Sequence, residues 1–200
     1  MTWTPFELDR LALEIVLDAK KRDAKIKEPD LDAKNRKEKL KKSESSEPSK
    51  QEGGLGSLNQ VYKMRAACTY GLERFWGEHL RLAHVEDPSK QDQAKKQEKV
   101  QFKEDRKKAK IIIDTWLSFV GIMKVAGIHL PNTVVNLNKG TEIPPKALAV
   151  DEIEKFSNQI WNLSTMEAQI SLSVLTSFCD SIVWWTQRLK SGTGDQQDEI

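Results

Sequence analysis

Three histidines and two cysteines are the residues best suited to bind a metal ion or to act as nucleophiles. His79 and His84 are five residues apart and His129 stands alone, whereas zinc sites on helices place two ligands four residues apart. Cys68 and Cys179 each lie in an apolar helical pattern, without a neighbouring basic residue that would lower the pKa of a nucleophilic thiol. We therefore predict no metal site and two buried free thiols, with a single disulfide as the alternative.

Two further patterns that could carry chemistry have simpler explanations. Residues 53–57 are rich in glycine and precede a helical pattern, but no strand comes before them and no lysine follows at the spacing of a phosphate-binding loop. Asp151, Glu152 and Glu154 gather at a predicted helix start, where the helix dipole favours negative charge. No other catalytic pattern occurs, so we expect a protein that is not an enzyme and that has no cofactor.

Basic residues concentrate in two stretches, 34–42 and 90–110. The first 110 residues carry a net charge of +6, whereas residues 111–200 carry −4. Either stretch could contact the phosphates of a nucleic acid or an anionic lipid, but acidic residues interleave in both, so a solvated charged surface is the simpler interpretation. The candidate anion-binding residues are Lys34, Arg36, Lys37, Lys39, Lys41, Lys42, Lys103, Arg106, Lys107 and Lys110.

Six tryptophans indicate either core packing or a binding surface. Single tryptophans at helical spacing are typical of a core, but Trp184 and Trp185 are adjacent. Successive residues on a helix point about 100° apart. If Trp185 faces the core, Trp184 lies near its edge, where a protein partner could contact it.

The candidate residues must be positioned by helices. The first 28 residues predict one amphipathic helix. Leu8, Leu11 and Ile15 share one apolar face, and Pro29 ends the helix by restricting the residue before it. This face must pack either on its own domain or on a partner. The candidate partner-binding residues are therefore Trp3, Leu8, Leu11, Ile15 and Trp184.

Residues 29–56 predict a charged, flexible linker, because hardly any of their side chains can be buried to offset the entropy of ordering. Residues 57–190 predict a bundle of about four helices, and residues 191–200 predict a disordered tail. The first helix of the bundle is expected to continue to about Val85. A long helix from Pro88 is expected to project as a charged rod, to enter the core at Ile111 and to end at Pro131.

The remaining segments complete the bundle. Residues 133–143 predict either a small β-hairpin or an ordered loop. A helix from about Lys146 to Leu163 follows. The pair Ser164 and Glu167 then predicts a capping box that opens the last helix.

The sequence thus predicts an all-α protein with a helical bundle and a tethered N-terminal helix. Residues 111–130 are apolar, but Asp114 and Lys124 argue against a membrane span, and Glu7 and Asp9 against a signal peptide. We expect an intracellular protein, cytoplasmic or nuclear. The expected function is a non-enzymatic interaction or assembly protein that self-associates or binds a protein partner. The alternatives are a nucleic-acid-binding protein that uses residues 34–42 and 90–110, and a peripheral membrane or matrix-type protein on anionic lipid.

Overall fold

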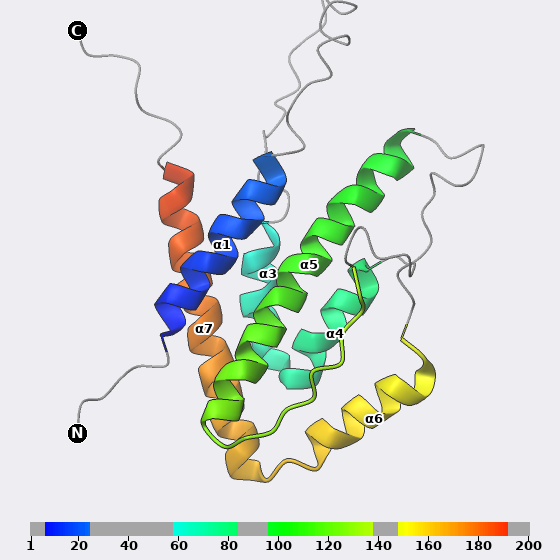
Figure 1. Cartoon of the computed structure of the whole chain (residues 1–200), viewed down its shortest axis with the longest axis vertical. Coiled ribbons are helices and arrows are strands. Elements are labelled where there is room, and N and C mark those ends of the chain that lie inside the picture. The colour runs from blue at the N-terminus through cyan, green and yellow to red at the C-terminus, as the bar shows by residue number, and fades with distance from the viewer. Residues whose placement is uncertain (1–6, 25–57, 84–95, 138–147, 192–200) are drawn as a thin grey trace, which may run out of the picture.

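The computed structural model confirms the all-α fold class (Figure 1). It describes residues 7–24, 58–83, 96–137 and 148–191. These residues contain no strand, and none of their helices is long and apolar enough to cross a membrane. The elements are α1 (Leu8–Ala24), α3 (Gln60–Ala67), the 3-10 helix η1 (Cys68–Tyr70), α4 (Leu72–Leu82), α5 (Lys96–Val125), α6 (Val150–Trp161) and α7 (Thr165–Ser191).

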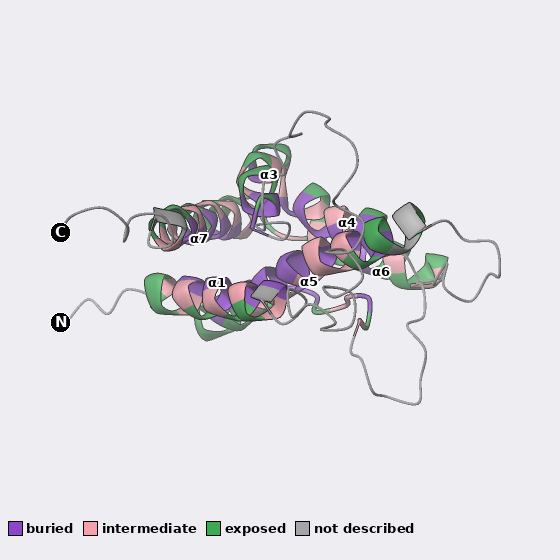
Figure 2. Ribbon diagram, turned by 90° about the horizontal axis from the view of Figure 1, so that it is seen from above, coloured by how far each residue is buried: buried purple, intermediate pink, exposed green. Residues whose placement is uncertain are grey.

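The three longest helices, α1, α5 and α7, form the frame of the bundle (Figure 1). Helix α1 lies side by side with α7 and also contacts α5 (Figures 1 and 2). Helix α3 packs on α7, and α4 packs on α5. Helix α6 lies at the side of the bundle and contacts α4.

The centre of the core is aromatic. The rings of Trp76 and Phe156 stack with their centroids 3.7 Å apart and their planes 14° apart, and Trp116 lies 5.6 Å from Phe156. Both indole N–H groups donate to the loop that follows α5: Trp116 Nε1 to the carbonyl of Pro131 at 3.0 Å and Trp76 Nε1 to that of Thr133 at 2.6 Å. The large rings are therefore buried with their polar atoms satisfied, which a stable core requires.

The apolar face of α1 packs on the chain's own bundle. Ala12, Val16 and Ala19 have no exposed surface, and Ile15 is only 7% exposed. These residues belong to the same continuous hydrophobic cluster as those of the other helices. Of the two ways in which this face could be covered, the structure shows docking on its own chain.

The predicted continuous helix over residues 57–85 is wrong, because the chain breaks at Gly71. This glycine has φ 102°, a conformation that residues with a Cβ rarely adopt, and it separates α3 and η1 from α4. Likewise, α5 ends at Val125 and not at Pro131. Gly127, with φ 80°, closes a Schellman motif in which Ile128 N–H donates to Met123 O at 2.9 Å and Gly127 N–H to Lys124 O at 3.1 Å.

Helix α5 also enters the core earlier than Ile111, where the sequence places that point. Phe102, Asp105 and Ala109 are already buried. Their spacing of three and four residues puts them on one face of the helix, so this face continues that of Ile112 and Trp116. The charge of the surrounding residues, and of Asp105 itself, hides this short buried stripe in the sequence.

Further predictions concern the segment before α6 and the start of α7, whereas the predicted linker over residues 29–56 and residues 192–200 of the predicted tail lie outside the described residues. Residues 133–137 form a loop without a strand, whereas residues 138–143 lie outside the described residues. The capping box at the start of α7 is confirmed: Glu167 N–H donates to Ser164 Oγ at 3.2 Å, and Ser164 N–H donates to Glu167 Oε2 at 2.9 Å. The hydrogen bonds from the Ser164 side chain and backbone lower the pKa of Glu167.

His79 connects α4 to the loop that follows α5. Its ring is buried, Nδ1–H donates to the carbonyl of Trp76, and Nε2 accepts the N–H of Val135 at 3.3 Å. Burial lowers the pKa of His79, with the bond to Trp76 acting in the opposite direction. The ring is therefore held neutral, because protonation would remove the acceptor that Val135 needs and would bury a charge.

The burial of α1 predicts that Ile15→Ala weakens the whole bundle. We expect the free energy of unfolding to fall by about 2–5 kcal/mol, because the buried side-chain carbons beyond Cβ are lost and a cavity remains. Chemical denaturation followed by circular dichroism should show one transition at a lower midpoint. Glu14→Ala, one position away on the exposed face, should leave the midpoint nearly unchanged. Loss of α1 helicity alone, with the bundle unaffected, would contradict the shared core.

The buried His79 ring predicts a pH-dependent stability. Its pKa in the folded chain lies below the unfolded value of about 6.5, so its contribution is complete above that pH and is lost as the pH falls below it. Between pH 6.5 and 5 the free energy of unfolding should therefore decrease. We expect His79→Gln to reduce this slope, whereas the exposed His129→Gln should retain it. Equal slopes in the two variants would refute the assignment.

Candidate functional site

A cleft of about 440 Å³ opens between the first turn of α1 and the second half of α7. Among the described residues, its lining consists of one residue from α1 and four from α7: Asp9, Asp180, Ser181, Trp184 and Trp185. The four α7 residues follow the spacing i, i+1, i+4 and i+5, so they share one face of that helix. The cleft exists because α1 packs along α7 and brings Asp9 to this face.

The aromatic part of the cleft consists of two perpendicular indoles. The rings of Trp184 and Trp185 lie 4.7 Å apart at 82°. Trp185 packs against the core, whereas Trp184 is 44% exposed, the arrangement that their adjacent positions on a helix predict. Arg188 Cζ lies 3.3 Å from the centroid of the Trp184 ring, so this indole already holds one cation against its π-face.

The polar part of the cleft is acidic. Asp9 lies in the first turn of α1, and Asp180 forms an ion pair with Arg65 while its side chain stays 57% exposed. Ser181 adds a hydroxyl that can donate or accept a hydrogen bond. Two carboxylates beside two indoles form a surface whose chemistry suits an ammonium or guanidinium group.

The structure distributes the predicted partner-binding residues differently. Trp184 lies in the cleft, Leu8 and Leu11 are partly buried against the core, and Ile15 is buried. Trp3 lies outside the described residues. Sequence reasoning missed Asp9 and Asp180, because only the docking of α1 on α7 brings these two distant residues together.

The predicted anion-binding residues do not form a free basic patch in the part of the chain that the structure describes. Lys107 Nζ pairs with Asp23 Oδ1 at 3.6 Å, and Lys110 Nζ pairs with Asp114 Oδ1 at 2.6 Å. The Arg106 guanidinium lies over the ring of Phe102, and Lys103 is exposed. The other six residues, Lys34, Arg36, Lys37, Lys39, Lys41 and Lys42, lie outside the described residues.

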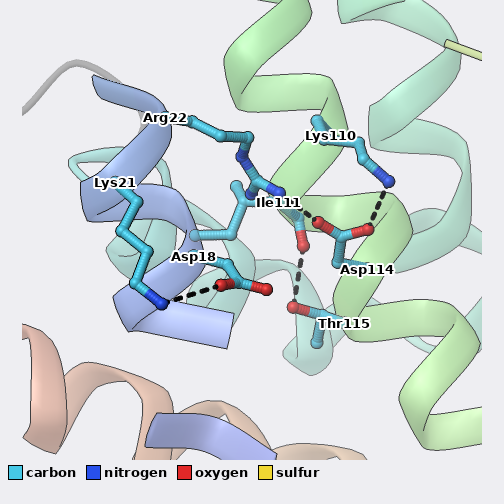
Figure 3. Close-up of polar contacts among 7 residues, drawn as sticks. All are labelled: Asp18, Lys21, Arg22, Lys110, Ile111, Asp114 and Thr115. Atoms are coloured by element: carbon cyan, nitrogen blue, oxygen red, sulfur yellow. Dashed lines mark hydrogen bonds and ion pairs between the residues drawn. The ribbon is translucent and has the colours of Figure 1, made fainter. Parts of the chain in front are cut away.

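Asp114 is the centre of an ion-pair network that joins α1 to α5 (Figure 3). Its carboxylate accepts from Arg22 Nη1 at 2.9 Å and from Lys110 Nζ at 2.6 Å. All three side chains are at most 32% exposed. Nearby, Asp18 and Lys21 form a pair at 3.7 Å that is largely exposed. The network fixes the C-terminal part of α1, at the opposite end of the helix from the cleft.

The described residues contain no group of three or more metal-binding side chains close enough to hold an ion. Cys68 and Cys179 are buried free thiols, which confirms the prediction. Neither thiol lines the cleft.

The Asp114 network predicts unequal effects for two matched substitutions. Asp114→Asn removes the charge that compensates Arg22 and Lys110, so we expect the free energy of unfolding to fall by about 1–3 kcal/mol. Asp18→Asn breaks only an exposed pair and should cost less than about 1 kcal/mol. Urea denaturation of the two variants beside the wild type measures both effects. A loss of similar size in the two variants would argue against a structural role for the network.

A scan against protein-family models, a search of curated proteins and a search of solved structures gave no match to this chain. Within the described residues, the cleft between α1 and α7 places an exposed aromatic side chain beside two carboxylates, one of them paired with Arg65, and it is the candidate binding site.

Proposed function

We propose that the chain is a non-enzymatic protein-interaction module whose partner places a basic side chain in the cleft between α1 and α7. The observation that carries this proposal is the composition of the cleft: Asp9 and Asp180 beside the perpendicular indoles of Trp184 and Trp185. The two carboxylates come from different helices, and both lie beside the exposed indole of Trp184.

The chemistry of each group supports a basic side chain as ligand. An indole face attracts a cation within about 6 Å of its centroid, and the contact of Arg188 with Trp184 is an intramolecular example. A carboxylate adds charge and accepts a hydrogen bond from the same cation. The methylene groups of a lysine or arginine can pack along the second indole while the charged end reaches Asp9.

The charge distribution of the chain supports a second copy as the partner to test first. Six of the nine residues in 34–42 are basic, and residues 1–110 carry net +6. Helix α7 belongs to the acidic part, residues 111–200, with net −4. A basic segment of one copy is therefore complementary to the cleft of another, and self-association follows from this pairing.

Nucleic acid and anionic lipid remain alternatives that rest on the basic stretches alone. Three of the four candidate residues in α5 are already engaged by Asp23, Phe102 and Asp114. No contact among the described residues favours either ligand over a protein partner. We therefore extend neither alternative beyond the sequence.

The proposal predicts that Trp184→Ala weakens binding of a peptide with the sequence of residues 34–42. We expect a loss of at least about fivefold in affinity, since an exposed tryptophan at the centre of an interface contributes more than about 1 kcal/mol. Asp9→Asn should weaken binding in the same direction. Isothermal titration calorimetry with the full chain measures both effects.

Trp161→Ala provides the matched control, because Trp161 is 64% exposed and lies outside the cleft, with its Nε1 donating to Glu73. It should bind the peptide like the wild type. Sedimentation of the full chain over a range of concentrations then tests self-association, which Trp184→Ala should reduce. Equal affinities of Trp184→Ala and Trp161→Ala would exclude the cleft as the binding site. A concentration-independent monomer that still binds the peptide through Trp184 would exclude the second copy as the partner.

A further inference from the structure

Two thiols that are 111 positions apart in the sequence meet in the core. Cys68 is the first residue of η1, Cys179 lies within α7, and their Sγ atoms are 3.7 Å apart. Each residue is 1% exposed. This contact depends on the packing of α3 and η1 against α7.

We propose that Cys68 and Cys179 are a disulfide-forming pair, a covalent modification site at which a peroxide oxidant joins η1 to α7. The two sulfur atoms are already in van der Waals contact, and a disulfide requires about 2.05 Å. The remaining approach is less than 2 Å. Rotation of the side chains with a small shift of η1 is sufficient, because η1 is three residues long and ends at Gly71, whose positive φ separates it from α4.

The surroundings make the two thiols unequal. The hydrogen bond between the two thiols lowers the pKa of Cys68, burial opposes this effect, and the nearby Arg65 guanidinium lowers the pKa further. The same bond and burial raise the pKa of Cys179. Cys68 is therefore the thiol that ionises first and serves as the nucleophile. Arg65 precedes Cys68 by one helical turn, and it is the basic neighbour that the sequence analysis overlooked.

The oxidation balances with hydrogen peroxide as oxidant. The Cys68 thiolate attacks one peroxide oxygen, so that an S–O bond forms, the O–O bond breaks and the leaving hydroxide takes a proton to become water. Cys179 then attacks the sulfur of the sulfenic acid, the S–S bond forms, and the departing hydroxide takes the Cys179 proton to become a second water. The pair loses two electrons and two protons in total, and the peroxide is reduced to two waters.

The oxidant reaches Cys68 through η1. The residues that follow Cys68, Thr69 and Tyr70, are both exposed, so a local opening of this short helix uncovers the thiol without unfolding α7. Once formed, the bond closes a loop of more than 100 residues. It should raise the melting temperature by about 10 °C, because the unfolded chain loses much of its conformational freedom.

The experiment uses the full chain, reduced and then exposed to a small molar excess of hydrogen peroxide under native conditions. We expect the intact mass to fall by two hydrogens, the two thiols to become unreactive to iodoacetamide after denaturation, and proteolysis to release one cross-linked peptide that contains both cysteines. A dithiol reductant should reverse all three changes. Two thiols that remain alkylatable after the peroxide-treated chain is denatured, or a disulfide that joins two chains on a non-reducing gel, would overturn the proposal.

Single substitutions identify the nucleophile. In Cys179→Ser, peroxide should convert Cys68 to a sulfenic acid that dimedone traps, whereas in Cys68→Ser the trapping at Cys179 should be at least tenfold slower. Circular dichroism checks that both variants remain folded. If one of the variants does not fold, the rate of disulfide formation in the wild-type chain is measured as a function of pH instead. A rate that does not increase as a thiol ionises would exclude Cys68 as the attacking group. Equal rates of dimedone trapping in the two folded variants would also exclude Cys68 as the preferred attacking group.

Discussion

The packing of α1 between α5 and α7 is the contact on which the rest of this structure depends. It completes the hydrophobic core with Ala12, Val16 and Ala19 and brings Arg22 to Asp114. It also carries Asp9 to the exposed face of α7, where the cleft is formed. The burial of one apolar face therefore stabilises the bundle and also forms the cleft at the N-terminal end of α1. An amphipathic helix that is marginal alone gains its order from this burial.

The sequence was sufficient for features that depend on local periodicity. The all-α class, the capping box of Ser164 and Glu167 and the edge position of Trp184 all follow from the spacing of side chains along one helix. The sequence was insufficient where the backbone conformation of a single residue decides where a helix ends. Gly71 and Gly127 end helices through positive φ, and neither residue differs in its sequence context from a glycine that a helix tolerates.

The candidate site was only partly predictable, for a related reason. Trp184 stood out because of its neighbour, but Asp9 and Asp180 are ordinary surface carboxylates until α1 docks on α7. The basic residues of α5 show the opposite case, in which residues that stand out in the sequence do not form a site in the fold. Charge composition suggested a surface for anions, whereas Lys107 and Lys110 compensate Asp23 and Asp114 within the fold. Net charge describes a segment, but its function depends on which charges the packing has already paired.

The loop after α5 satisfies the polar atoms of three core rings with every second residue: the carbonyls of Pro131 and Thr133 accept from Trp116 and Trp76, and the N–H of Val135 donates to His79. This alternation is the period of an extended chain, in which neighbouring residues turn their backbone groups to opposite sides. The bonds involve the backbone alone, so they place few demands on the identity of the side chains. Inserting or deleting one residue would turn the wrong groups toward the rings and leave buried donors without acceptors. The segment should therefore tolerate substitutions in evolution more readily than any change in its length.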